Sequence, residues 1–222
     1  MTILIMNQIC KSEMEKLKQW KMIMTPDEIQ FCVKKCADII NKRFANDKII
    51  VVGILKGCVY FFTDLTKQLI LPQSWYFIDA SSYYNSQTQS DKVTIIGSIE
   101  PSKFVDRQVV LIDELFDSGK TLNDIKRAIM EKAAVPPERI YTCTLFKKNI
   151  ITKYPEPDLY GISVPNIWLV GYGLDDCQEK RNWTYLYGVP KESGSVETDD
   201  DIIFKNNIAY EKIRSKITDQ MR

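Results

Sequence analysis

The fold is decided by residues 109–121, which read Val-Val-Leu-Ile-Asp-Glu-Leu-Phe-Asp-Ser-Gly-Lys-Thr. The four apolar residues at the start show no polar alternation, as expected of a strand that is buried on both faces. Two acids follow, then two apolar residues, a third acid and a small polar turn. Beyond the turn, Leu122, Ile125 and Ile129 recur at helical spacing. The stretch therefore predicts a buried strand, a glycine-containing turn and a helix.

A turn that opens a helix in this way predicts an anion site. The first N–H groups of a helix lack partners and carry partial positive charge, so a phosphate is a natural ligand. Gly119-Lys120-Thr121 matches the end of a Walker A loop, but Glu114 stands where that loop needs its earlier glycine. This disfavours a nucleotide triphosphatase. Asp113 and Glu114 lie where a sugar diol or a divalent cation would be held. The alternative is a plain solvated turn, which would not need a third acid, Asp117.

Length and composition predict a single domain, 1–222, with a core over about 26–189 and a polar extension over 190–222. Of its 222 residues, 45% are hydrophobic, which supports a full core. No apolar stretch is long enough for a membrane span, and Met1 to Met6 is too short for a secretory signal, so a cytoplasmic location is expected. A net charge of +1 offers no electrostatic footprint for nucleic acid.

The chain contains no histidine, which limits its chemistry. Ser-His-Asp catalysis and histidine-ligated zinc are excluded, and proton transfer must fall to a carboxylate, Lys, Tyr or Cys. The six cysteines are scattered and indicate reduced thiols. Cys32 and Cys36 are one helical turn apart on an apolar face, which favours core packing over metal binding.

Strands and helices alternate along the rest of the chain. Thr25-Pro26-Asp27-Glu28 is a helix start with a capping box, and it predicts a helix over 26–45 after an N-terminal arm, 1–24. Strands are predicted at 48–55, 75–80, 92–99, 140–146, 159–164 and 185–189, and a last helix at 206–221. The pattern predicts an α/β fold, a parallel sheet flanked by helices, with ligands at the carboxyl ends of its strands.

Three further segments are candidates for parts of a binding site. The strand 48–55 ends in Lys56-Gly57 and is followed by a helical pattern, which makes a second, weaker anion candidate. A polar stretch, 81–91, contains Ser82 and Tyr83 and predicts a mobile loop or a hairpin tip. Residues 168–175 read Trp-Leu-Val-Gly-Tyr-Gly-Leu-Asp.

Together these segments resemble the type I phosphoribosyltransferases, and specifically the hypoxanthine-guanine phosphoribosyltransferase family. Residues 109–121 resemble its phosphoribosyl pyrophosphate motif, although that family usually has Glu then Asp where this chain has Asp113 then Glu114. Residues 53–57 resemble its pyrophosphate loop, which implies a non-proline cis peptide between Leu55 and Lys56. Residues 168–175 with Arg181 resemble its purine-and-metal segment. The resemblance also implies a small hood lobe built from the termini.

The resemblance implies a purine salvage enzyme that requires Mg2+. It would transfer the 5-phosphoribosyl group from phosphoribosyl pyrophosphate to guanine or hypoxanthine, giving GMP or IMP and pyrophosphate. The implied catalytic base is Asp117, and the implied homo-oligomer is a homodimer or homotetramer. The implied phosphoribosyl pyrophosphate and 5′-phosphate residues are Asp113, Glu114, Asp117, Ser118, Gly119, Lys120 and Thr121. The implied pyrophosphate-binding residues are Lys56, Gly57, Arg181, Ser82 and Tyr83. The implied purine-binding residues are Lys147, Trp168, Leu169 and Asp175. The implied metal ligands are Asp175, Asp113 and Glu114.

Two other functions stay open at this point. One is a regulatory protein on the same fold that binds nucleotides or RNA without catalysis, which the near-zero net charge and the retained Asp117 disfavour. The other is an adenine or pyrimidine enzyme, which Lys147 and residues 168–175 disfavour. The sequence does not rank guanine, hypoxanthine and xanthine.

Overall fold

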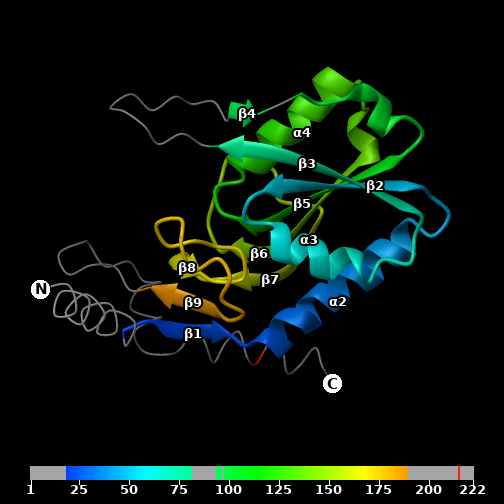
Figure 1. Cartoon of the computed structure of the whole chain (residues 1–222). Coiled ribbons are helices and arrows are strands. Elements are labelled where there is room, and N and C mark those ends of the chain that lie inside the picture. The colour runs from blue at the N-terminus through cyan, green and yellow to red at the C-terminus, as the bar shows by residue number, and fades with distance from the viewer. Residues whose placement is uncertain (1–18, 82–93, 97, 190–214, 216–222) are drawn as a thin grey trace, which may run out of the picture.

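The computed structural model describes residues 19–81, 94–96, 98–189 and 215. Its centre is a six-stranded sheet in the order β4-β3-β2-β5-β6-β7 (Figure 1). The strands are β2 (Ile49–Leu55), β3 (Gln73–Ser81), β4 (Thr94–Ile96), β5 (Gln108–Phe116), β6 (Ile140–Lys148) and β7 (Leu159–Val164). All pairs are parallel except β3 with β4, which is antiparallel. The predicted parallel sheet is confirmed, and β4 is the return strand predicted over 92–99, of which residues 92, 93 and 97 lie outside the described residues.

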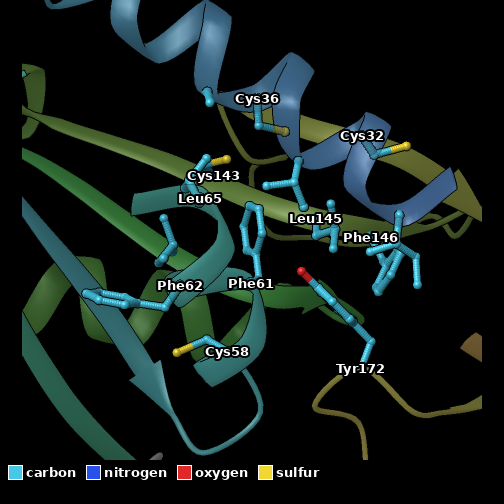
Figure 2. Packing of buried hydrophobic residues seen from close by; sticks show 14 of the residues in the cluster. Cys32, Cys36, Cys58, Phe61, Phe62, Leu65, Cys143, Leu145, Phe146 and Tyr172 are labelled. Carbon is cyan, nitrogen blue, oxygen red and sulfur yellow. The ribbon is translucent and has the colours of Figure 1, made fainter. Parts of the chain in front are cut away.

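Helices cover both faces of this sheet, which explains its unbroken apolar strands. On one face, α2 (Pro26–Arg43) and α3 (Val59–Thr66) pack on alternate residues of β2, β5 and β6. On the other face, α4 (Lys120–Ala133) and the short helix η1 (Pro101–Phe104) cover the remaining residues. Another short helix, η2 (Pro137–Arg139), leads into β6. Figure 2 shows the α2–α3 side of the core, where Phe61, Leu65 and Leu145 interdigitate.

The start of α2 has the predicted capping box. The backbone N–H of Glu28 donates to Thr25 Oγ1 at 3.3 Å, and the Thr25 N–H donates to Glu28 Oε2 at 2.8 Å. Pro26 follows the N-cap, where its missing N–H costs nothing. Cys32 and Cys36 are buried on the inner face of this helix, as predicted for core residues. Their burial raises the pKa of the Cys32 thiol to about 12, so it stays protonated.

A second, three-stranded sheet forms a small lobe in the order β1-β9-β8, with both pairs antiparallel. Its strands are β1 (Lys21–Met24), β8 (Trp168–Val170) and β9 (Leu186–Val189). In the lobe, a strand from the N-terminal part of the chain pairs with a strand from its C-terminal part. The lobe lies beside the carboxyl ends of the main-sheet strands (Figure 1). The predicted hood lobe is confirmed, while β1 was missed because its four residues lie within the predicted N-terminal arm.

In the part of the chain described, no helix is both long enough and apolar enough to cross a membrane. Ser215 is helical, within the terminal helix predicted over 206–221; the rest of that segment lies outside the described residues.

Candidate active site

The predicted site residues on β5 lie at the carboxyl edge of the main sheet. β5 runs to Phe116, so Asp113 and Glu114 belong to the strand itself and Asp117 begins the turn after it. Asp113 pairs with Thr144 of β6 in the parallel ladder and is 9% exposed. The buried strand of the prediction is therefore longer than its four apolar residues, because the pairing with β6 continues through the acids.

Three segments that are distant in sequence meet beside Glu114. A Cβ added to Gly57 would lie 1.8 Å from Glu114 Oε1, so the carboxylate fills the space that Gly57 leaves open. A Cβ added to Gly173 would lie 1.9 Å from the Gly57 carbonyl oxygen, and Gly173 has a φ of +99°. Glycine is required at Gly173, where another backbone approaches closely and φ is positive, while at Gly57 any side chain would displace the Glu114 carboxylate. The loop after β2, the end of strand β5 and the loop after β8 thus form one site.

The 171–181 loop carries an ion pair at this site. Arg181 Nη2 is 2.7 Å from Asp175 Oδ1, and Arg181 Nη1 donates to the Gly173 carbonyl at 2.8 Å. The Gly173 N–H donates back to the Arg181 carbonyl at 2.9 Å. The structure therefore brings together Asp175, Arg181, Glu114 and Gly57, as predicted, and pairs two of them directly.

Asp113 and Glu114 are held in an environment that disfavours their charge. Burial, with the neighbouring Glu114 carboxyl, holds the pKa of Asp113 well above its usual range. Burial also raises the pKa of Glu114, although the charge of Arg181 acts in the opposite direction. Two adjacent buried carboxyls with raised pKa values are typical of a functional site, since a folded core gains nothing from them.

We expect Asp113→Asn to stabilise the ligand-free protein at pH 8, with a smaller effect near pH 5. The pKa of Asp113 is higher in the folded protein than in the unfolded chain. Protonated Asp113 therefore favours folding at low pH, and this contribution to the free energy of unfolding is lost as the pH rises through the folded-state pKa. Asn keeps the oxygen that accepts from the Glu114 N–H at 3.0 Å and removes the charge. Relief of about 1 kcal/mol would raise Tm by roughly 2–4 °C. Calorimetry in EDTA measures this, with Asp38→Asn on the exposed face of α2 as the control. A lower Tm at pH 8 would contradict it.

The predicted 5′-phosphate turn has the geometry of an anion-binding helix start. Gly119 is the N-cap of α4 with a φ of +83°, and the helix begins at Lys120. A Cβ at Gly119 would lie 2.6 Å from the Phe116 ring, so a side chain has no room. Ser118 and Thr121 flank this glycine and carry hydroxyl groups. Lys120 is the exception in the predicted set, since its Nζ pairs with Asp124 Oδ2 at 2.9 Å within the helix.

The two lysines that end β6 have different partners. Lys147 Nζ is 2.7 Å from Glu156 Oε1 and lies 5.1 Å from the centre of the Tyr160 ring. Lys148 Nζ is 3.2 Å from Asp117 Oδ2, and its side chain is only 9% exposed. Adjacent residues of a strand point to opposite faces, so only one of the two can face Asp117. The structure therefore pairs Asp117 with Lys148, which the sequence prediction did not include, and pairs the predicted Lys147 with Glu156.

The remaining predicted residues are placed as follows. The cis peptide between Leu55 and Lys56 is confirmed. Lys56 is exposed directly after β2, at the same edge of the sheet. Trp168 begins β8 and is 58% exposed, so it is not a core residue, while Leu169 is buried. Ser82 and Tyr83 lie outside the described residues.

The carboxylates at this site suit a hard cation such as Mg2+, although they do not surround a cation on all sides. Glu114 Oε2 is buried and makes no hydrogen bond in the structure. Among described residues, no three acidic, cysteine or histidine side chains are grouped to hold a metal by themselves. Asp113, Glu114 and Asp175 supply carboxylate oxygens, which Mg2+ prefers. That ion is usually held by one or two carboxylates together with substrate phosphates.

Comparisons with known proteins agree with this geometry. A family model for the phosphoribosyl transferase domain matches residues 19–176. The hypoxanthine-guanine phosphoribosyltransferase of Bacillus subtilis is 31% identical over 167 residues, which cover 75% of this chain and 91% of that protein. The bifunctional protein TilS/HprT of Listeria innocua is 32% identical over 170 residues. That match covers 75% of this chain, which spans only 25% of the length of this bifunctional relative.

Solved structures show the same fold. A hypoxanthine-guanine phosphoribosyltransferase from Bacillus anthracis superposes with a TM-score of 0.68 at 28% identity, over 76% of this chain and 98% of that one. A hypoxanthine phosphoribosyltransferase from Staphylococcus aureus gives 0.67 at 28% identity, over 79% and 94%. The fold and the site define a phosphoribosyltransferase, and the chain belongs to that family. Within it, the chain belongs with the hypoxanthine-guanine phosphoribosyltransferases, as the sequence resemblance predicts.

Proposed function

We propose that this chain transfers the 5-phosphoribosyl group from phosphoribosyl pyrophosphate to a 6-oxopurine, guanine or hypoxanthine, releasing pyrophosphate. The observation that carries the proposal is the meeting of the predicted segments at one edge of the sheet. Glu114 lies against Gly57, Gly57 lies against Gly173, and Asp117 lies against Lys148. The relatives named for this activity support it, and the bifunctional relatives share only this portion of their length.

The substrate's two anionic ends have two places to bind. The turn 117–121 would hold the 5′-phosphate through the N–H groups of the first turn of α4 and the Ser118 and Thr121 hydroxyls. The pyrophosphate would lie at Lys56, Gly57 and Arg181, on the other side of Glu114. Asp113 and Glu114 would then be beside the ribose hydroxyls. This leaves the sugar C1 between the two anion sites, where the glycosidic bond must form.

Bond breaking at C1 develops positive charge on the sugar and negative charge on the departing pyrophosphate. Arg181 and Lys56 would stabilise the departing charge as it grows, which is where fixed charges are most effective. Asp117 would take or share the proton on purine N7. When bound, Mg2+ would neutralise charge on the pyrophosphate and hold the ribose hydroxyls, with Asp113, Glu114 and Asp175 as its protein ligands. Trp168 would stack on the purine ring.

We assign the donor to purine O6 to Lys148 in place of the predicted Lys147. Both lysines are buried at the end of β6 and each is paired with an acid, but Lys148 contacts the proposed base, Asp117, whereas Lys147 contacts Glu156. An ammonium group has donors and no acceptor, so it can pair with the oxygen of a 6-oxopurine and cannot pair with the amine of adenine.

The proposal is tested by a panel of bases with the purified chain, phosphoribosyl pyrophosphate and Mg2+. We expect turnover of guanine or hypoxanthine, little turnover of adenine, and loss of activity in EDTA. Absence of turnover with every base, together with tight binding of a nucleoside monophosphate, would favour the non-catalytic regulator instead.

Assembly as a homodimer or homotetramer and a cytoplasmic location are part of the same proposal. Sedimentation velocity of the purified chain tests the assembly directly. A monomer at micromolar concentration would contradict it.

A further inference from the structure

Tyr172 joins the 171–175 loop to the core. It lies between Gly171 and Gly173, and its own φ is +50°, a conformation that is unfavourable for a bulky side chain. The residue is 4% exposed, and the centre of its ring lies 5.9 Å from that of Tyr60 and 6.4 Å from that of Phe146. Figure 2 shows the side chain reaching from its loop toward Phe61 and Leu145. The ring is therefore buried in the core while its backbone belongs to the site.

The hydroxyl of Tyr172 donates a hydrogen bond to the carboxylate of Asp64. It donates to Asp64 Oδ2 at 2.8 Å, and the same oxygen accepts from Gln30 Nε2 at 2.6 Å. Asp64 lies near the end of α3, and Gln30 lies on α2. Burial, with the nearby Asp64 carboxylate, raises the pKa of Tyr172, so the hydroxyl remains a donor. The bond links the loop to both helices on that face of the sheet.

This hydrogen bond lies beside the close approach between the two parts of the proposed pyrophosphate site. α3 follows directly on Lys56 and Gly57, while Tyr172 is next to Gly173, whose backbone lies against the Gly57 carbonyl. Arg181 in turn donates to the Gly173 carbonyl and pairs with Asp175. A shift of Tyr172 would therefore move Arg181 and Asp175 relative to Lys56. Hydrogen bonds to a charged group are stronger than neutral ones, which suits this role.

We infer that Asp64 and Tyr172 are positioning residues for pyrophosphate binding: their hydrogen bond holds the 171–175 loop, with Asp175 and Arg181, in register with Lys56 and Gly57. This rests on the proposed function for the identity of the ligand. Neither side chain touches that ligand; both act through the loop. The inference explains why a tyrosine occupies a left-handed backbone position between two glycines.

The test is calorimetric binding of pyrophosphate and of phosphoribosyl pyrophosphate, each with Mg2+, to the whole chain. Tyr172→Phe removes one oxygen, and Asp64→Ala removes the acceptor; each should weaken binding by about 10- to 100-fold. The double variant should bind pyrophosphate as tightly as the single variant with the lower affinity, because the two residues act as one unit. In turnover, KM for phosphoribosyl pyrophosphate should rise more than kcat falls, since the proton transfer at Asp117 is untouched.

Asp64→Asn distinguishes positioning from a general loss of stability. Its carbonyl oxygen can still accept from Tyr172, so binding should return to within about threefold of wild type. Lys67→Ala is the control, because Lys67 contacts the other oxygen of Asp64 at 3.7 Å and its side chain is 68% exposed. Wild-type affinity in Tyr172→Phe would overturn the inference, and so would an Asp64→Asn variant as weak as Asp64→Ala. Binding is measured without turnover, so an inactive wild type would refute the proposed function and leave this test intact.

Discussion

Asp117→Asn should lower kcat by about 100- to 10,000-fold, because general-base catalysis contributes roughly 10²–10⁴. In a chain without histidine, Asp117 is the carboxylate that lies between the end of β5 and the N-cap of α4, and it contacts Lys148. Asn keeps the shape and loses the basicity. Steady-state turnover of guanine with phosphoribosyl pyrophosphate and Mg2+ measures the effect.

The affinity for phosphoribosyl pyrophosphate separates a lost base from a damaged site. The N–H groups at the start of α4 come from the backbone and do not depend on the carboxylate, so binding should change far less than kcat. Asp124→Asn is a suitable control, since Asp124 pairs with Lys120 and Arg127 one turn further along the same helix. A kcat near that of wild type for Asp117→Asn would remove Asp117 from the mechanism.

Most of the fold could be predicted because its signals are local. The unbroken apolar run before Asp113 predicts a strand covered on both faces, and Thr25 with Glu28 marks the first turn of α2. The acids themselves were harder to place. Asp113 and Glu114 are in the strand because β6 continues to pair with it, and pairing between distant strands leaves no mark on a single stretch of sequence.

The same reason explains why the lysine that contacts Asp117 could not be identified from the sequence. Lys147 and Lys148 are adjacent in sequence, and only the register of β6 against β5 decides which of them faces Asp117. Tyr172 was noticed as part of a resemblance, while its bond to Asp64 joins residues 108 positions apart. The spacing of Gly-Tyr-Gly was nevertheless a usable signal, because glycines on both sides of a large residue indicate a backbone under close constraint.

The two lysines also give the sharpest test of base specificity. Lys148→Ala should reduce kcat/KM for guanine and hypoxanthine relative to adenine by at least about 5- to 150-fold. A buried donor that faces an amine costs about 1–3 kcal/mol, more when the donor is charged, at roughly 1.4 kcal/mol per tenfold. Hypoxanthine and guanine differ at C2 and share the C6 oxygen, so their ratio should not change. Comparing bases removes any effect that Lys148 has on Asp117, because that effect is common to all of them.

Lys147→Ala is the matched comparison, one residue away on the opposite face of β6. It should break the contact with Glu156 and leave the preference for 6-oxopurines intact. The reverse result, with specificity lost in Lys147→Ala and kept in Lys148→Ala, would restore the assignment predicted from the sequence. It would also require Lys147 to leave Glu156 when the purine binds. If neither variant alters the preference, neither lysine recognises the C6 oxygen, and backbone N–H groups become the candidates.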